Sequence, residues 1–277
     1  MDGTLLNSSS RISSATAAAV RAVCQSGVMV VLATGKARPA ALAAAREAGL
    51  EGQHLLVSRQ GPGVFLQGLA VHGSKGQLLT SAQLQPEVVA QVFRHVSATY
   101  PDGSVSCVAF TGDDCVTLRM TQELQDLHSV YYEPLASVAP SLGQLQAGRP
   151  VRKLLLMTSP QVVQEQLAPH WNQQLQGTQA KTMQAVPNML EIVPQSVNKW
   201  AGMKRLLQHL RVTPAELLAV GDGDNDLELI TGAGVGVAMG NATPRVKAAA
   251  DAHVASNDDD GVAQALEQFV LRAAWRK

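Results

Sequence analysis

Apolar residues along the first sixty positions follow two alternating spacings. Residues 14–25 carry alanine and valine at helical spacing behind a serine, which predicts a helix. Residues 28–33 form a continuous, β-branched apolar run, which is typical of a parallel strand covered on both faces. A second alanine-rich helix is predicted over residues 39–48 and a short strand over residues 55–58. This alternation of helix and strand predicts an α/β domain.

The pattern changes near Gly61. Two helical patterns, at residues 86–100 and 160–174, are interleaved with short strand candidates. These candidates are residues 64–66, 69–72, 105–110, 116–120 and 153–157. Short strands mixed with helices in this way favour an antiparallel α+β insert. We therefore predict a second domain over residues 61–185.

The α/β rhythm resumes after the predicted insert. The expected strands are residues 190–193, 217–220 and 235–238. The expected helices are residues 199–210, a helix near Leu227, and residues 244–250 and 261–270. The predicted core domain is therefore discontinuous, with residues 1–60 and 186–277 on either side of the insert.

Charge and cysteine content narrow the class of protein. The 277 residues include 22 Lys plus Arg and 22 Asp plus Glu, so no net field favours nucleic acid or an anionic membrane as a partner. A small-molecule partner is predicted instead. Three cysteines without C-x-x-C spacing indicate neither a disulfide framework nor a zinc site. No apolar run approaches the roughly 20 residues that span a bilayer, and the first residues lack the regions of a secretory signal.

Three aspartates crowd the segment 220–226, which reads Val-Gly-Asp-Gly-Asp-Asn-Asp and lies between an apolar strand and a helix. In an α/β sheet, the loops at the carboxyl ends of strands bind ligands. Asp222, Asp224 and Asp226 repel one another unless a hard cation lies among them. Carboxylate oxygens are the ligands that Mg²⁺ selects, so the segment predicts a divalent metal site.

Two other interpretations of this acidic segment make different demands. A calcium-binding EF-hand loop needs a glycine where Leu227 stands and a glutamate where Ala233 stands, so it is excluded. A purely structural turn, in which an aspartate caps the next helix, remains an alternative to the metal site.

Two further positions carry weaker signals for phosphate binding. Thr34-Gly35 ends a predicted strand and opens a helix, where a hydroxyl and backbone N–H groups bind a phosphate oxygen well. A strand-ending turn is the alternative there. Asn198-Lys199 begins a predicted helix, and Lys199 would present its ammonium to a phosphate, with a solvated surface lysine as the alternative.

Four short segments, in chain order, resemble the motifs of the haloacid dehalogenase-like phosphatases. They are Asp2-Gly3-Thr4-Leu5, Thr34-Gly35, Asn198-Lys199 and Gly221-Asp222-Gly223-Asp224-Asn225-Asp226. The match is closest to the Cof-type subfamily, whose large cap is inserted between the second and third motifs. The closing stretch, with Met239-Gly240-Asn241 and Ser256-Asn257-Asp258, also looks like that subfamily. The resemblance implies an α/β fold, a Rossmann-like doubly wound parallel-sheet core with an inserted α+β cap domain.

The resemblance also implies a reaction, a Mg²⁺-dependent phosphatase reaction through a phospho-aspartate. Asp2 would be the acid and base, and its backbone carbonyl would be a metal ligand. The implied metal residues are Asp2, Asp222 and Asp226, and the implied phosphate-binding residues are Thr34, Gly35, Lys199 and Asn225. Asp224 and Asp226 are further implied as supporting residues of the site. Cation, lysine and backbone donors would together neutralise charge in the transition state.

The sequence departs from the family pattern at one point. The family places its nucleophilic aspartate two residues before Asp2, at the end of an apolar strand, and the 277 residues include nothing there. We hypothesise that the natural product extends upstream and that Met1 is an internal methionine. Without that central strand, apolar faces such as residues 28–33 would be exposed at a cost of about several kcal/mol. An in-frame stop codon just before Met1, found at the 5′ end of the transcript, would overturn the hypothesis.

Two functions remain open from the sequence. The first is hydrolysis of small phosphorylated metabolites, such as sugar phosphates or nucleotide-like phosphates, by the full-length protein. The second is an inactive phosphate- or metal-binding protein; an aspartate two residues before Asp2 discriminates between them. A superfamily mutase is disfavoured because such mutases carry a smaller cap in another position. The expected location is the cytoplasm, or a plastid or mitochondrion if a transit segment lies upstream. The sequence does not define the oligomeric state.

Overall fold

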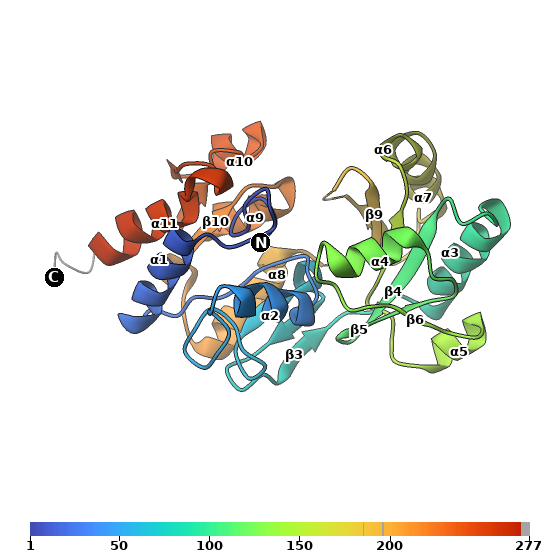
Figure 1. Ribbon diagram of the computed structural model, residues 1–277, viewed down its shortest axis with the longest axis horizontal. Coiled ribbons are helices and arrows are strands. Elements are labelled where there is room, and N and C mark those ends of the chain that lie inside the picture. Colours follow the sequence, from blue (N-terminus) through green and yellow to red (C-terminus); the bar gives the residue numbers. More distant parts are fainter. Residues whose placement is uncertain (185, 196, 273–277) are drawn as a thin grey trace. The chain divides into compact units, whose positions relative to one another are not determined.

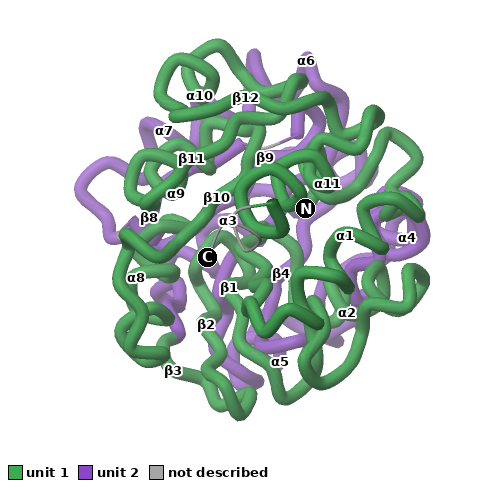
Figure 2. The backbone as a smooth tube through the Cα atoms, turned by 90° about the vertical axis from the view of Figure 1, so that its left-hand side faces the viewer, with its two compact units in different colours: residues 1–80, 198–277 green, residues 81–197 purple. Residues whose placement is uncertain are grey.

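The chain forms two compact units. The computed structural model describes residues 1–184, 186–195 and 197–272. Unit 1 contains Met1–Thr80 and Asn198–Lys277, and unit 2 contains Ser81–Val197. The elements of both units are labelled in Figure 1, and Figure 2 shows unit 1 in green and unit 2 in purple. Each unit is described by itself below.

The unit boundaries lie later in the chain than the predicted domain boundaries. The sequence placed these boundaries after residues 60 and 185, whereas the units change after residues 80 and 197. Residue 185 itself lies outside the described residues. The first difference has a physical cause in Val64, whose N–H donates to the Leu32 carbonyl (2.8 Å) and whose carbonyl accepts from the Thr34 N–H (2.9 Å). These bonds tie the segment after Gly61 to unit 1.

Unit 1 combines two small sheets with helices. Its helices are α1 (Ser14–Gln25), α2 (Arg38–Glu47), α8 (Lys199–Leu210), α9 (Leu227–Gly232), α10 (Pro244–Ala249) and α11 (Gly261–Leu266). Shorter helical turns are η1 (Leu66–Gly68), η3 (Pro214–Glu216), η4 (Asp224–Asp226), η5 (Asn257–Asp259) and η6 (Glu267–Leu271). Its strands are β1 (Gly63–Phe65), β2 (Ala70–His72), β3 (Leu78–Ser81), β10 (Leu218–Gly221), β11 (Val235–Ala238) and β12 (Ala252–His253).

The second of these sheets positions the acidic loop. Strands β10, β11 and β12 pair in parallel in that order, with α9 and α10 as the crossovers between them. Neighbouring parallel strands end at the same edge of a sheet, so the loops after β10 and β11 lie together. The Met239 N–H donates to the Gly221 carbonyl (3.0 Å), and the Thr243 N–H donates to the Asp222 carbonyl (3.0 Å). The loop after β11 therefore supports the loop after β10.

Two predicted strands of the core are wrong as regular strands. Within residues 28–33 the chain forms a single parallel bridge, between Ala33 and Val64. Residues 55–58 likewise contribute one bridge, between Val57 and Glu51. A strand requires a ladder of hydrogen bonds with a neighbour, and β-branched composition alone does not provide that neighbour.

Unit 2 is built on one mixed sheet with the strand order β6-β5-β4-β7-β9-β8. The strands are β4 (Ser106–Thr111), β5 (Asp114–Thr117), β6 (Ser137–Val138), β7 (Lys153–Met157), β8 (Ala180–Met183) and β9 (Met189–Pro194). The helices are α3 (Pro86–Thr99), α4 (Gln122–Ser129), α5 (Leu142–Ala147), α6 (Pro160–Val162) and α7 (Ala168–Gln174), with the π-helical turn η2 (Val163–Leu167) between the last two. All pairings are antiparallel except that of β5 with β6. The predicted antiparallel character of the insert is therefore present here.

Side chains alternate across this sheet as the strand period requires. Leu154, Leu156 and Ile192 belong to a buried apolar cluster with Val92 of α3 and Trp171 of α7. The predicted strand at residues 190–193 lies within β9, which pairs antiparallel with β7 and β8 in unit 2 and not with the parallel strands of unit 1. Within the described part of the chain, no helix has the length and apolar character needed to cross a membrane.

Candidate active site

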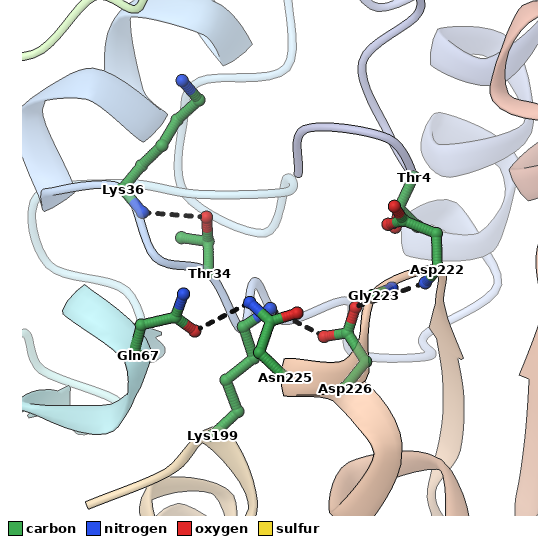
Figure 3. Close-up of polar contacts among 9 residues, drawn as sticks. All are labelled: Thr4, Thr34, Lys36, Gln67, Lys199, Asp222, Gly223, Asn225 and Asp226. Atoms are coloured by element: carbon green, nitrogen blue, oxygen red, sulfur yellow. Dashed lines mark hydrogen bonds and ion pairs between the residues drawn. The ribbon is translucent and has the colours of Figure 1, made fainter. Parts of the chain in front are cut away.

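The segment that carries Asp2 is a tight turn against the acidic loop. The Met1 carbonyl accepts hydrogen bonds from the N–H groups of Thr4 (3.2 Å) and Leu6 (2.9 Å). Gly3 has a φ of +69°, and a Cβ there would collide with the Asp222 carboxylate, so a glycine is required. The Thr4 hydroxyl donates a hydrogen bond to Oδ1 of Asp222 (Figure 3). The first and last of the four motifs therefore contact each other.

The acidic loop is folded around the Asp226 carboxylate. Oδ2 of Asp226 accepts hydrogen bonds from the N–H groups of Asp222 and Gly223, each at 3.2 Å. This closeness depends on Gly221, because a Cβ there would lie 2.7 Å from the Cβ of Asp226. One carboxylate oxygen thus satisfies two backbone donors at the end of β10, which fixes the conformation of the loop.

The other oxygen of Asp226 holds a lysine. Asn198 caps α8, its side chain accepting from the Ala201 N–H (2.7 Å), and places Lys199 at the first helical position. Nζ of Lys199 lies 2.7 Å from Oδ1 of Asp226, and the two side chains are only 5% and 8% exposed. Burial by itself raises the pKa of Asp226, but the Lys199 ammonium and the hydrogen bonds lower it below its ordinary value. The structure therefore has a buried, charge-paired ammonium at this loop.

Asp224 points to a different neighbour. Its Oδ1 accepts from the Thr243 hydroxyl (2.7 Å) and its Oδ2 lies 3.2 Å from Nη1 of Arg245. Thr243 also caps α10 by accepting from the Val246 N–H (3.3 Å). Asp224 therefore joins the acidic loop to the start of α10, and the supporting role that the sequence implied for it stays a prediction.

Gln67 links two of the predicted phosphate-binding residues. Its Oε1 accepts from Nδ2 of Asn225 (3.2 Å), and its side chain packs so closely on Gly35 that a Cβ there would lie 2.7 Å from Nε2. Its own N–H donates to the Thr34 carbonyl (2.9 Å), and its φ of +60° is unusual for a residue other than glycine. Figure 3 shows Asn225 between Gln67 and Asp226. Gln67 thus joins the loop after residue 33 to the acidic loop.

The Asp2 side chain is the most accessible of the candidates. It is 52% exposed, and its Oδ1 lies 3.1 Å from Nζ of Lys36, whose own side chain is only 4% exposed. The Lys36 N–H donates to the Thr34 hydroxyl oxygen (3.1 Å), so the same residue contacts both the second motif and Asp2. The Asp2 carboxylate is therefore open to solvent on one side and held by a buried ammonium on the other.

The donor set of the acidic loop fits a hard cation in part. Burial raises the pKa of Asp222. The hydrogen bond from Thr4 acts in the opposite direction, and the negative charge of Asp226 raises the pKa further. A half-buried carboxylate of this kind gains from a nearby cation, and oxygen donors are what Mg²⁺ prefers. No group of three or more His, Cys, Asp or Glu side chains suited to a metal gathers within the described residues. Asp226 in particular already uses both oxygens, so Asp222 is the better carboxylate ligand.

Asp222→Asn is expected to stabilise the metal-free protein at neutral pH. The raised pKa means that the folded state holds the Asp222 proton more tightly than the unfolded state does. The free energy of unfolding therefore falls as the pH rises from the ordinary carboxyl pKa to the raised pKa of Asp222. Above the raised pKa it stays at the lower value. An amide removes that loss. Melting temperatures of both proteins in EDTA, from about pH 4 to pH 8, measure the difference. Mg²⁺ should raise the melting temperature of the unsubstituted protein only; an equal rise in the variant would contradict the assignment of Asp222.

The structure brings most of the predicted site residues together by direct contacts. Asp222 contacts the Asp2-Gly3-Thr4 segment, Asp226 holds Lys199, and Asn225 reaches Gly35 through Gln67. Gln67 and Lys36 were not among the predicted residues. Lys36 directly follows the Thr34-Gly35 motif, and this position could have identified it as a site residue from the sequence. Gln67 lies in a segment without a motif, so the sequence gives no such indication for it.

Comparisons with known proteins identify the family. A family profile described as haloacid dehalogenase-like hydrolase matches residues 1–266. An Arabidopsis thaliana protein named chloroplastic endoribonuclease YBEY is 39% identical over 271 residues, which are 98% of this chain and 46% of that protein. The HMP-PP phosphatase of Cronobacter sakazakii is 31% identical over 256 residues, 90% of this chain and 85% of that protein. The crystal structure of a haloacid dehalogenase-like hydrolase from Bacteroides thetaiotaomicron is similar with a TM-score of 0.82 and 28% identity, over 96% of each chain.

The chain belongs to the haloacid dehalogenase-like hydrolases. The resemblance predicted from the four motifs, the predicted α/β class and the predicted class of enzyme are thereby confirmed. The chain spans about half the length of the Arabidopsis protein, at 46%. The name of the Arabidopsis protein, endoribonuclease, refers to a protein more than twice as long as this chain. The match to the Cronobacter phosphatase, by contrast, covers 85% of that protein.

Proposed function

We propose that this chain is the body of a Mg²⁺-dependent phosphatase that acts on small phosphorylated metabolites through a phospho-aspartate. One observation carries the proposal. The acidic loop holds the buried Lys199 ammonium through Asp226 and contacts the Asp2-Gly3-Thr4 turn through Asp222. A fixed cation, a carboxylate and an accessible acid that meet at the acidic loop are the parts that phosphoryl transfer needs, because the protein's task is mainly positioning and charge neutralisation.

The proton transfers are assigned to Asp2. In the proposed reaction an aspartate two residues before Asp2 attacks the phosphorus, and Asp2 donates a proton to the leaving oxygen. Asp2 then takes a proton from the water that hydrolyses the phospho-aspartate. Its 52% exposure supports this role, since the carboxyl must reach both solvent and substrate.

The phosphoryl oxygens are assigned to Thr34, Gly35, Lys199 and Asn225. Lys199 supplies a full positive charge that Asp226 prevents from moving. Asn225 is oriented by Gln67, which also packs on Gly35. Groups held in place before the reaction stabilise the developing charge without having to reorganise.

Mg²⁺ would be held by Asp222 and by the backbone carbonyl of Asp2. When bound, it would supply positive charge to the transferring phosphoryl group. The sequence also implied Asp226 as a metal residue, and this stays a prediction. We propose a different role for Asp226, because its two oxygens already accept from Lys199 and from two backbone N–H groups.

The substrate class and the location are further parts of the proposal. The Cronobacter relative is named as an HMP-PP phosphatase, which supports a small phosphorylated substrate for this chain. The Arabidopsis relative is named as chloroplastic, which supports a plastid over the cytoplasm. Import of the full-length protein, fused to a fluorescent protein, into plastids would distinguish these two locations.

Release of inorganic phosphate from an aryl phosphate tests the proposed function. The protein used is one that continues upstream of Met1 with an aspartate two residues before Asp2. We expect turnover with Mg²⁺ and none with EDTA, and Asp222→Asn should lower turnover by about 100-fold or more. Arg245→Ala is the matched control, because the ion pair of Arg245 is with Asp224, and both side chains are at least half exposed. Phosphate binding without turnover in the folded protein would favour the alternative, an inactive phosphate-binding protein.

A further inference from the structure

Two asparagines join the turn that carries Asp2 to two loops near the end of the chain. Asn241 follows β11, and Asn257 begins η5. Nδ2 of Asn241 donates to the Gly3 carbonyl (2.8 Å), and Nδ2 of Asn257 donates to the Leu6 carbonyl (2.9 Å). The Asn257 N–H donates to Oδ1 of Asn241 (3.1 Å). The two side chains therefore form one connected clamp on the turn.

The amide group is required by this arrangement. Asn241 donates through its nitrogen and accepts through its oxygen, and a carboxylate would lose the donor. The same holds for the bond from Asn257 to Leu6. The N–H groups of Thr4 and Leu6 donate to the Met1 carbonyl, so these hydrogen bonds lie within the turn. The side-chain amides of Asn241 and Asn257 bind the turn to the rest of unit 1.

Neighbouring residues extend the contact beyond the turn. The Ser8 N–H donates to Oδ1 of Asp258 (2.7 Å), and the Ser13 hydroxyl, which also caps α1, donates to Oδ1 of Asp260. Residues 257–260 thus lie alongside residues 6–13 and are hydrogen-bonded to them. Within the segments 241 and 257–260, the two asparagines are the residues whose side chains bind the backbone of the turn itself, at Gly3 and Leu6.

We propose that Asn241 and Asn257 are positioning residues, which keep Asp2 and Thr4 in place against Asp222. Thr4 contacts Asp222 directly, and Gly3 has no room to move toward that carboxylate. A shift of the turn would therefore displace the acid and base without displacing Lys199, which Asp226 holds independently. The kinetic part of this inference rests on the proposed function; the structural part does not.

Hydrogen exchange tests the structural part on the 277-residue chain. Asn241→Asp, Asn241→Ala and Asn257→Asp should speed amide exchange in a peptide covering residues 1–8 by about five- to tenfold, the effect of losing one hydrogen bond. Ser256→Ala is the matched control, because Ser256 lies beside Asn257 but its hydroxyl donates to Asp259 (2.6 Å). Unchanged exchange in this peptide, or an equal increase across all peptides of unit 1, would overturn the proposal.

Steady-state kinetics tests the catalytic part in the protein that carries the upstream aspartate. The three variants should lower kcat by about 10- to 100-fold and change KM by less than about twofold, because an interaction that positions the acid acts on turnover. A raised KM with unchanged kcat would show that the clamp does not position the acid. If the unsubstituted protein releases no phosphate, the proposed function fails, and the exchange result alone decides whether the two amides hold the turn.

Discussion

Lys199→Met is expected to lower phosphate release by about 100- to 1,000-fold and to destabilise unit 1 by about 3–5 kcal/mol. The activity is lost because the substitution removes the ammonium assigned to the phosphoryl group. The stability is lost because Asp226 stays buried, only 8% exposed, without its charge partner. Phosphate release from an aryl phosphate and urea unfolding measure the two effects separately.

A second substitution separates the two roles of this lysine. Asp226→Asn in the Lys199→Met background should recover much of the lost stability, because an amide oxygen can still accept from the N–H groups of Asp222 and Gly223 without carrying a buried charge. It should not recover activity. Lys204→Met is the matched control on α8. Nζ of Lys204 lies over the Trp200 ring at 5.8 Å, a contact of small energy, so both activity and stability should be nearly unchanged. Full activity in the Lys199→Met single variant would contradict the assignment of Lys199.

Lys153→Met is expected to destabilise unit 2 by about 3–5 kcal/mol. Nζ of Lys153 lies 2.9 Å from Oε1 of Glu191 and 4.5 Å from the centre of the Phe110 ring, and the two charged side chains are 3% and 11% exposed. Oε2 of Glu191 has no hydrogen-bond partner among the described residues. Removing the lysine therefore leaves a buried carboxylate without a counter-charge, which urea unfolding would detect as a lower midpoint.

Two comparisons test the cause of that loss. The double variant Lys153→Met/Glu191→Leu should be close to the unsubstituted protein in stability, because well-packed apolar side chains often replace a buried ion pair without loss. Arg149→Ala breaks the exposed pair with Asp114, whose side chains are 70% and 63% exposed, and should change stability little. If Lys153→Met and Arg149→Ala behaved alike, the buried pair would not be the cause.

The local helical signals of the sequence were sufficient to predict most helices. Helices α1 and α8 begin and end where they were predicted, at Ser14–Gln25 and Lys199–Leu210. In each, a polar residue before the helix accepts a backbone N–H, Ser13 from Thr16 and Asn198 from Ala201. Caps and apolar spacing are properties of a few neighbouring residues, so the sequence displays them directly.

Strand partners were not predictable in the same way. Residues 190–193 have the apolar run expected of a core strand, yet β9 pairs with β7 and β8 in unit 2. Residues 28–33 have a similar run and form only the bridge between Ala33 and Val64. A strand's partner lies far away in the chain, and neither composition nor periodicity specifies it.

The candidate site was predicted as a set of motif residues but not as a set of contacts. Each motif lies on one loop, so Asp222, Lys199 and Thr34 were found from local spacing. The contact of Asp226 with Lys199 spans 27 positions, and that of Asn225 with Gln67 spans 158. Gln67 has no motif and is recognised only by its left-handed backbone, with φ of +60°, and by its place beside Gly35.

Mg²⁺-dependent phosphate release by two forms of the protein tests the central claim most directly. The first form is the 277-residue chain, and the second continues upstream of Met1 so that an aspartate stands two residues before Asp2. The phospho-aspartate mechanism predicts release from an aryl phosphate by the second form only, and none when that added aspartate is replaced by asparagine. Equal release by the two forms, or none by a second form shown to be folded, would contradict it.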